Sequence, residues 1–149
     1  MLNKKRIAIL LGDPSGIGPE IVSKLLCEKI VDDANILVIG ERKILEDGEN
    51  ISGKKGNFKF VNNSKDIVFD DKTKFFLDIS KGTNRTYKYG QVSAESGASV
   101  LEAMDEAMDL ANNKKIDAVN FGPMNKTSLI MGGCPYNDEH DYFQKKLRM

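Results

Sequence analysis

The feature that most constrains this chain is a short apolar run followed by a glycine-rich turn and a helix-like segment. The apolar run covers 7–11, the turn reads Gly-Asp-Pro-Ser-Gly-Ile-Gly over 12–18, and a helical pattern follows from Pro19. Glycine lets the backbone approach a ligand closely, and a helix start adds unpaired N–H donors and the positive end of the helix dipole. Pro19 suits a first helical position, where its missing N–H costs nothing. The pattern predicts a strand–turn–helix unit in which Gly16 and Gly18 belong to a candidate anion site; a tight turn without a ligand is the alternative.

The turn differs from the common nucleotide-binding loops. Gly16 and Gly18 lack a third glycine at the spacing of the G-x-G-x-x-G fingerprint. The chain has no G-x-x-x-x-G-K-[ST] motif either, which argues against a P-loop nucleoside triphosphatase. Asp13 lies inside the turn, where a carboxylate can accept backbone N–H bonds or meet a ligand hydroxyl. Both roles of Asp13 stay open.

Composition indicates an ordinary globular domain. The 149 residues are 40% hydrophobic and 30% charged, which is sufficient for one core. The 22 Lys and Arg balance the 22 Asp and Glu, so charge does not indicate a nucleic-acid partner. Cys27 and Cys134 form no C-x-x-C pair, which favours a reduced, cytoplasmic protein with buried thiols. The run at 7–11 is too short for a signal peptide or a membrane span, so no membrane partner is expected.

Apolar runs alternate with helical patterns along the rest of the chain. The clearest helix is expected over 94–112, with Ser93 as its N-cap. A short helix is expected to start at Glu41, and the Gly-, Asn- and Lys-rich stretch 47–56 is expected to be a loop. This alternation predicts the α/β class: a three-layer α/β/α domain with a mostly parallel sheet. Beyond the first strand, strands are predicted at 34–40, at 58–61 near a sheet edge, at 74–79 and at 116–121.

Two turns follow strands directly, at 12–18 and at 122–126. Ligands of parallel sheets lie outside the carboxyl ends of the strands, so both turns are predicted to share one rim and face one site. Lys126 can bind a phosphate or carboxylate as a compact charge, or it is a solvated surface lysine. Asn125 can orient a substrate hydroxyl or cap the helix that follows.

The single histidine, His140, lies among carboxylates in the stretch 137–143. A histidine in such a setting can be a metal ligand, a general base or a substrate contact. The stretch holds no second histidine, and Asp138 and Glu139 equally suit the acidic start of a helix. The residues themselves leave these possibilities open.

Three segments together resemble one enzyme family. Residues 12–20 match throughout the pattern G-D/E-P-A/S-G-I-G-P-E/D of the 4-hydroxythreonine-4-phosphate dehydrogenase family, which includes the phospho-threonate and phospho-erythronate dehydrogenases. The stretch 89–97 resembles the family's G-x-x-x-x-x-x-G opening to a long helix, and 121–126 resembles its T-G/A-P-x-N/H-K segment. The resemblance covers essentially the whole chain, as the N-terminal part of a longer protein.

The resemblance implies an oxidoreductase of pyridoxine biosynthesis that uses NAD or NADP. Such an enzyme oxidises a phosphorylated four-carbon hydroxy acid, for example 4-phosphooxy-threonine, and a divalent metal such as Zn, Mg or Co assists the decarboxylation. A cytoplasmic homodimer is implied, with a small phosphorylated substrate. The implied fold is the first lobe of the isocitrate/isopropylmalate dehydrogenase-like fold: one α/β lobe over 1–149, with a second lobe that begins near 127 and is mostly missing. The family's three metal histidines lie beyond this length, so no metal ligand is expected here and no catalytic residue is assigned.

This chain departs from the family's substrate-contacting segment, which reads G-H-T-E. Without gaps, Glu139 lies opposite the family histidine and His140 opposite the threonine; with a one-residue insertion, His140 matches the histidine and Asp141 lies beside it. The alignment, and with it the identity of the four-carbon acid, stays open. The expected substrate-binding residues are Glu139, His140, Asp141, Lys126 and Asn125, and the expected anion-loop residues are Asp13, Gly16 and Gly18.

The 149-residue chain is expected to be inactive alone because it lacks the metal ligands. In the family, the first lobe is completed by chain that returns from the C-terminus, so an uncovered sheet edge and apolar surface are expected here. The alternative is a non-catalytic, truncated homologue that binds a phosphorylated metabolite or a full-length partner. A flavodoxin-like or nucleotide-binding α/β domain fits the periodicity but not the motifs at 12–18 and 123–126.

Overall fold

The structure is a computed structural model and describes residues 4–147. Within this range, five strands form one sheet in the order β3-β4-β2-β1-β5. Every pair of neighbouring strands is parallel, and in the register of β1, Ile7 lies between Ile36 and Ala118. The prediction of a parallel sheet with the strand at 58–61 at its edge is therefore confirmed. The strands are β1 (Arg6–Leu10), β2 (Asn35–Gly40), β3 (Lys59–Val61), β4 (Phe75–Asp78) and β5 (Ala118–Phe121).

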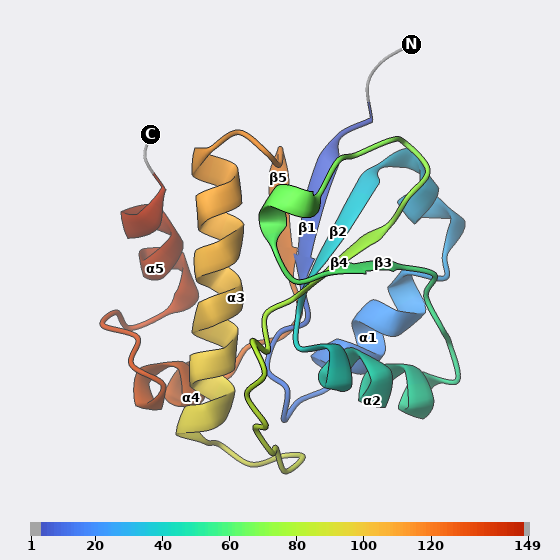
Figure 1. Cartoon of the computed structure of the whole chain (residues 1–149). Helices are drawn as coiled ribbons and strands as arrows, with labels where there is room; N and C mark the ends of the chain where they lie inside the picture. Colours follow the sequence, from blue (N-terminus) through green and yellow to red (C-terminus); the bar gives the residue numbers. More distant parts are fainter. Residues whose placement is uncertain (1–3, 148–149) are drawn as a thin grey trace.

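Helices cover both faces of the sheet and complete three layers (Figure 1). Ala8 and Leu10 of β1 pack into the core on the α3 side, whereas Ile9 and Leu11 pack into the core under α1 and α2. Successive strand residues point to opposite faces, so this continuous apolar run is what a strand buried on both sides requires. The helices are α1 (Gly18–Leu25) and α2 (Arg42–Ser52) on one face and α3 (Ala94–Asn112), α4 (Lys126–Met131) and α5 (Glu139–Lys146) on the other, with short 3-10 turns η1 (Lys29–Asp33) and η2 (Ser64–Asp66).

Helix α2 continues to Ser52, so the prediction of a loop over 47–56 is wrong for its first half. Gly48 lies where α2 crosses α1, and a Cβ there would come within 2.5 Å of the Pro19 backbone. The glycine that suggested a loop is required instead by helix packing. Glu49 is buried and accepts a 2.8 Å hydrogen bond from the Gly56 amide, which ties the following turn to the helix.

Helix α3 has the predicted bounds and the predicted cap. The Ser93 hydroxyl accepts a 3.1 Å hydrogen bond from the Ser96 amide, which satisfies one free donor of the first turn. Met104 and Met108 are buried in the core, as expected of methionines at helical spacing.

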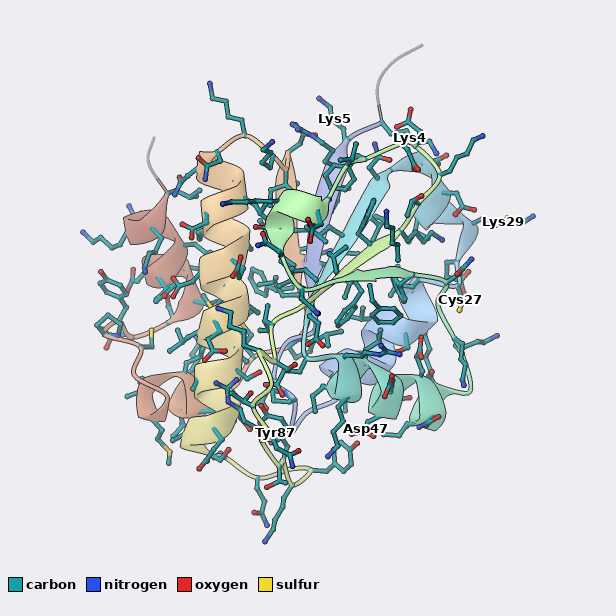
Figure 2. All side chains as sticks on the ribbon, in the orientation of Figure 1. Lys4, Lys5, Cys27, Lys29, Asp47 and Tyr87 are labelled. Atoms are coloured by element: carbon teal, nitrogen blue, oxygen red, sulfur yellow. The ribbon has the colours of Figure 1, made fainter. Side chains whose placement is uncertain are left out.

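The two cysteines are free thiols, and only one fits the expectation of burial. Cys134 is buried, whereas Cys27 is exposed in the turn after α1, where Figure 2 labels it. Helix α1 ends at Leu25, so Cys27 no longer shares the buried face of that helix.

None of the helices within 4–147 combines the length and apolar character needed to cross a bilayer.

Strand β5 forms an open edge of the sheet. Within the described part of the chain, its strand partner is β1. A groove of about 370 Å³ runs beside it and is lined mainly by apolar side chains of β5, α3 and α5, among them Met108, Phe121, Phe143 and Leu147. An uncovered edge and an apolar surface were expected of a first lobe, and both are present here.

Candidate functional site

The turns after β1 and β5 meet at one rim of the sheet, as predicted. The Asp13 amide donates a 2.9 Å hydrogen bond to the Pro123 carbonyl, and the Gly122 amide donates one of 2.9 Å to Leu10. Gly12 has a φ of +81°, and a Cβ on it would lie 2.5 Å from the Pro123 oxygen. Glycine is therefore needed at this contact. Since β2 and β5 flank β1 on opposite sides, this is the point where ligands of open α/β sheets usually bind.

The Asp13 carboxylate is buried inside this rim, with the residue only 6% exposed. Its Oδ1 accepts a 2.8 Å hydrogen bond from the Ser15 amide. Burial raises the pKa of Asp13, and hydrogen bonds from the Ser15 amide and the hydroxyls of Ser96 and Ser128 offset part of that rise. Of the two roles that the sequence left open, the structure shows the internal one: Asp13 receives backbone and hydroxyl donors of the protein itself.

A cluster of serines surrounds Asp13 and joins two helix starts. The hydroxyls of Ser15 and Ser96 lie 2.7 Å apart, and the Ser93 hydroxyl donates to Ser96 at 3.0 Å. The Ser128 hydroxyl accepts a 3.3 Å hydrogen bond from the Ser93 amide. The positive ends of α3 and α4 therefore converge near a carboxylate, which favours its negative charge. The sequence did not predict this cluster, because the Ser93 cap was the only one of its contacts with a local sequence signal.

The glycines of the turn allow its backbone to follow a tight path. The Gly16 amide donates a 3.0 Å hydrogen bond to the Asp13 carbonyl. A Cβ on Gly18 would lie 2.2 Å from the Leu11 oxygen, so the start of α1 lies directly against the end of β1. Gly16 and Ile17 remain exposed at the surface of the turn. The Ser15 and Gly16 amides thus have partners within the turn, while the tip faces outward.

A cleft of about 340 Å³ lies beside the turn. Its walls come from the turn, from α1 and α2, and from the segment that precedes α3. Figure 2 labels Asp47 on α2 and Tyr87 in that segment. The lining is mainly apolar and includes Ile17, Ile44, Ile51 and Tyr89.

Asn125 and Lys126 lie where the turn after β5 enters α4. The Asn125 Oδ1 accepts a 2.9 Å hydrogen bond from the Ser128 amide, so this side chain is the N-cap of α4. The Lys126 side chain is 60% exposed, and its Nζ lies 3.8 Å from the Asp138 Oδ2. The fold thus brings a solvated cation next to the stretch that holds His140.

The residues around His140 form the start of α5. The Asp138 Oδ1 caps the helix by accepting a 3.0 Å hydrogen bond from the Asp141 amide, and this bond lowers the pKa of Asp138. The His140 Nδ1 lies 3.8 Å from the Glu139 Oε1, and the His140 side chain is mostly exposed. Glu139 is partly buried, and its Oε2 has no hydrogen-bond partner among residues 4–147. Of these side chains, Asp138 lies beside Lys126, and Glu139 is the least accessible.

Helix α5 is anchored on α3 at its other end. The Tyr142 hydroxyl donates a 2.6 Å hydrogen bond to the Asp105 Oδ1, and Lys146 forms an ion pair of 2.9 Å with the same oxygen. Burial and the neighbouring carboxylate raise the pKa of Tyr142 to about 12. Helix α3 therefore positions both groups of site residues, the Asp13 cluster at its start and the α5 residues along its side.

The described residues do not form a metal centre by themselves. No group of three or more His, Cys, Asp or Glu side chains in 4–147 is placed to hold an ion. The oxygens nearest His140 already cap a helix or lie partly buried.

Comparison with known proteins identifies the relatives of this chain. A family model described as "Pyridoxal phosphate biosynthetic protein PdxA" matches residues 32–149. A relative in Pasteurella multocida (strain Pm70), provisionally named a 4-hydroxythreonine-4-phosphate dehydrogenase, is 33% identical over 97% of this chain and 44% of its own length. A relative in Fusobacterium nucleatum, provisionally named a D-threonate 4-phosphate dehydrogenase, is 33% identical over 89% of this chain and 40% of its own length.

Solved structures agree with these relatives. The crystal structure of a 4-hydroxythreonine-4-phosphate dehydrogenase from Burkholderia phymatum matches with a TM-score of 0.83 at 28% identity, over 98% of this chain and 45% of that one. The chain spans less than half the length of the relatives that it matches. The three-layer fold and the family match agree, and the chain belongs to the PdxA family of pyridoxal phosphate biosynthetic proteins.

Proposed function

We propose that this chain is the substrate-binding N-terminal half of a two-lobed dehydrogenase. In the complete form, the enzyme oxidises a phosphorylated four-carbon hydroxy acid such as 4-phosphooxy-threonine and decarboxylates the product. The observation that carries the proposal is Lys126: a solvated cation beside the start of α5, on the same rim as the turn at 12–18, in a PdxA-family chain. The second lobe is formed mostly by chain beyond residue 149, because Leu129, Cys134 and Tyr142 pack into the core of the first lobe.

The chain's own residues position the substrate in this proposal. The Lys126 ammonium binds the phosphate or carboxylate as a point charge, and His140 and Asp141, both exposed, contact the substrate's polar groups. Asn125 keeps Lys126 at the rim by capping α4, and the Asp13 amide joins the two turns through its hydrogen bond to the Pro123 carbonyl. A bound NAD or NADP would supply the hydride acceptor, and a divalent metal would supply Lewis-acid chemistry. We assign the ligands of both cofactors to the part of the protein beyond this chain.

Location and assembly belong to the same proposal. We infer a cytoplasmic enzyme that acts as a homodimer. The open β5 edge and its apolar groove support contact with further polypeptide, because an unpaired, uncharged edge strand offers a ready template for pairing. The alternative function is a truncated homologue without turnover that binds a phosphorylated metabolite or a full-length partner.

The decisive experiment compares two lengths of the protein. The reading frame is sequenced past codon 149, and any longer product is assayed beside the 149-residue chain for NADH formation from 4-phosphooxy-threonine and D-threonate 4-phosphate. We expect turnover by the longer protein and none by the short chain. NADH formation by the short chain would contradict the proposal, as would an inactive longer protein; a stop codon at 150 would favour the truncated homologue.

A further inference from the structure

A long irregular segment crosses the rim of the sheet before α3. Strand β4 ends at Asp78 and α3 begins at Ala94, and the fifteen residues between them form neither helix nor strand. Connections of this length are uncommon in compact domains and are usually either functional or disordered. Part of this one, residues 85–90, is held at both ends by specific contacts, and we name it the strap.

The first anchor is the Arg85 guanidinium, which bridges two carboxylates. Its Nη2 lies 2.5 Å from a Glu102 oxygen on α3, and its Nη1 lies 3.1 Å from the Oε1 of Glu41. The Arg85 side chain is only 18% exposed. Bridging of this kind fixes the direction of the strap, because guanidinium donors have a rigid planar geometry.

The buried Glu41 carboxylate depends on the strap for its hydrogen-bond donors. It follows β2 directly and is 5% exposed. Its Oε1 also accepts hydrogen bonds from the Tyr87 hydroxyl and, at 2.7 Å, from Ser99 on α3. A buried carboxylate is strongly unfavourable without such partners, and the strap supplies two of these three. Burial and the bond to Glu41 raise the pKa of Tyr87, so its hydroxyl stays a donor.

The second anchor lies at the other end of the strap. The Gly90 amide donates a 2.8 Å hydrogen bond to the carbonyl of Ser15, in the turn at 12–18. Tyr89 and Gly90 form the outer wall of the 340 Å³ cleft. Tyr87 lies between the two anchors in the sequence, and Figure 2 labels it at the end of the molecule where α2 and α4 lie. The strap therefore links a buried charge cluster to the glycine-rich turn.

We propose that Arg85 and Glu41 are positioning residues for the turn at 12–18. Their contact holds the strap against Ser15, keeps Gly90 bonded to the turn, and keeps Tyr89 over the cleft. Loss of the contact releases the strap and loosens the turn while the sheet below stays folded. The proposal concerns this chain's own geometry and does not depend on the proposed dehydrogenase reaction.

Amide hydrogen exchange, followed by NMR on the 149-residue chain, tests this. In Arg85→Gln, we expect the Gly90 and Gly16 amides to exchange about tenfold faster, with unchanged exchange in β2, because opening is local. Arg85→Lys retains a positive charge and is expected to give a smaller increase. Arg42→Gln is the matched control: Arg42 also pairs with a carboxylate, Glu46 at 2.9 Å, but it is exposed on α2 and should leave the strap unchanged.

Two results would overturn the proposal. Unchanged Gly90 exchange in Arg85→Gln would mean that other contacts hold the strap. An equal increase in β2 would mean that Arg85 only contributes to global stability. If Arg85→Gln does not fold, Arg85→Lys decides, because it keeps a positive charge beside Glu41 but removes the planar guanidinium bridge between Glu41 and Glu102. Faster exchange at Gly90 with unchanged β2 would then support the proposal, and no change would overturn it.

Discussion

Gly97 in α3 faces the backbone carbonyl of Ser128 in α4 so closely that an added Cβ would lie 1.7 Å from that oxygen. The contact is reciprocal, because a Cβ on Gly132, just after α4, would lie 2.4 Å from the Gly97 backbone. Two glycines thus let the helices touch backbone to backbone. This approach places Ser128 at the Asp13 cluster and Lys126 at the rim.

Gly97→Ala is expected to destabilise the chain by about 3 kcal/mol, the upper end of the usual range for overpacking. The obstructing atoms belong to backbone, so relief requires that α4 move away from α3. Urea denaturation followed by circular dichroism measures the effect. Gly16→Ala is the matched control, since its Cβ would meet only ordinary contacts at 3.4 Å. Equal stability of Gly97→Ala and the original chain would contradict this packing.

The Asp13 carboxyl is expected to titrate above its ordinary value of 3.8, because burial disfavours its charge. The folded chain then holds this proton more tightly than the unfolded chain. Stability contributed by protonated Asp13 is present below pH 3.8 and is lost as the pH rises through the raised pKa. Carbon-13 NMR of the carboxyl gives the pKa directly. Asp13→Asn should lack this part of the pH dependence of unfolding, and an identical dependence in both proteins would contradict the assignment.

Lys126→Ala is expected to weaken binding of 4-phosphooxy-threonine about tenfold, as loss of a charged hydrogen-bond partner does. NMR titration of the chain gives the dissociation constant. Lys81→Ala is a close control: Lys81 is 66% exposed and also lies 3.8 Å from a carboxylate, that of Glu106, but it is not on the turn after β5. Equal effects of the two substitutions would mean that Lys126 is an ordinary surface lysine.

The open β5 edge is expected to make the isolated chain associate as its concentration rises. Sedimentation velocity measures this association. Asn120→Lys adds a charge to the exposed edge and should weaken this association, because edge lysines oppose strand pairing. Ile51→Lys removes an exposed apolar residue of the cleft instead and should have little effect. Stronger loss of association in Ile51→Lys would place the contact at the cleft.

Local patterns were sufficient for most of the secondary structure. Apolar runs predicted all five strands to within a few residues, and helical periodicity with the Ser93 cap predicted α3. These signals are local because a strand buried on both faces must be apolar throughout, and a helix start must satisfy its free amides. The shared rim also followed from sequence, since both turns come directly after parallel strands.

Contacts between distant residues had no such signal. Gly48 resembled a loop residue until its contact with Pro19 explained it, and Arg85 belonged to an unremarkable polar stretch until Glu41, 44 residues away, became its partner. The sequence offered two roles for Asn125, and only the position of the Ser128 amide shows that its Oδ1 caps α4.

The sequence by itself determined the alternation of strands and helices, the two turns on one rim and the family resemblance, because each rests on residues adjacent in the chain. Only the tertiary structure decided that Asp13 is buried among serines, that Lys126 lies beside Asp138, and that the strap is tied to Glu41. Burial and pairing of charged groups depend on which distant segments pack together, and that packing is a property of the whole fold.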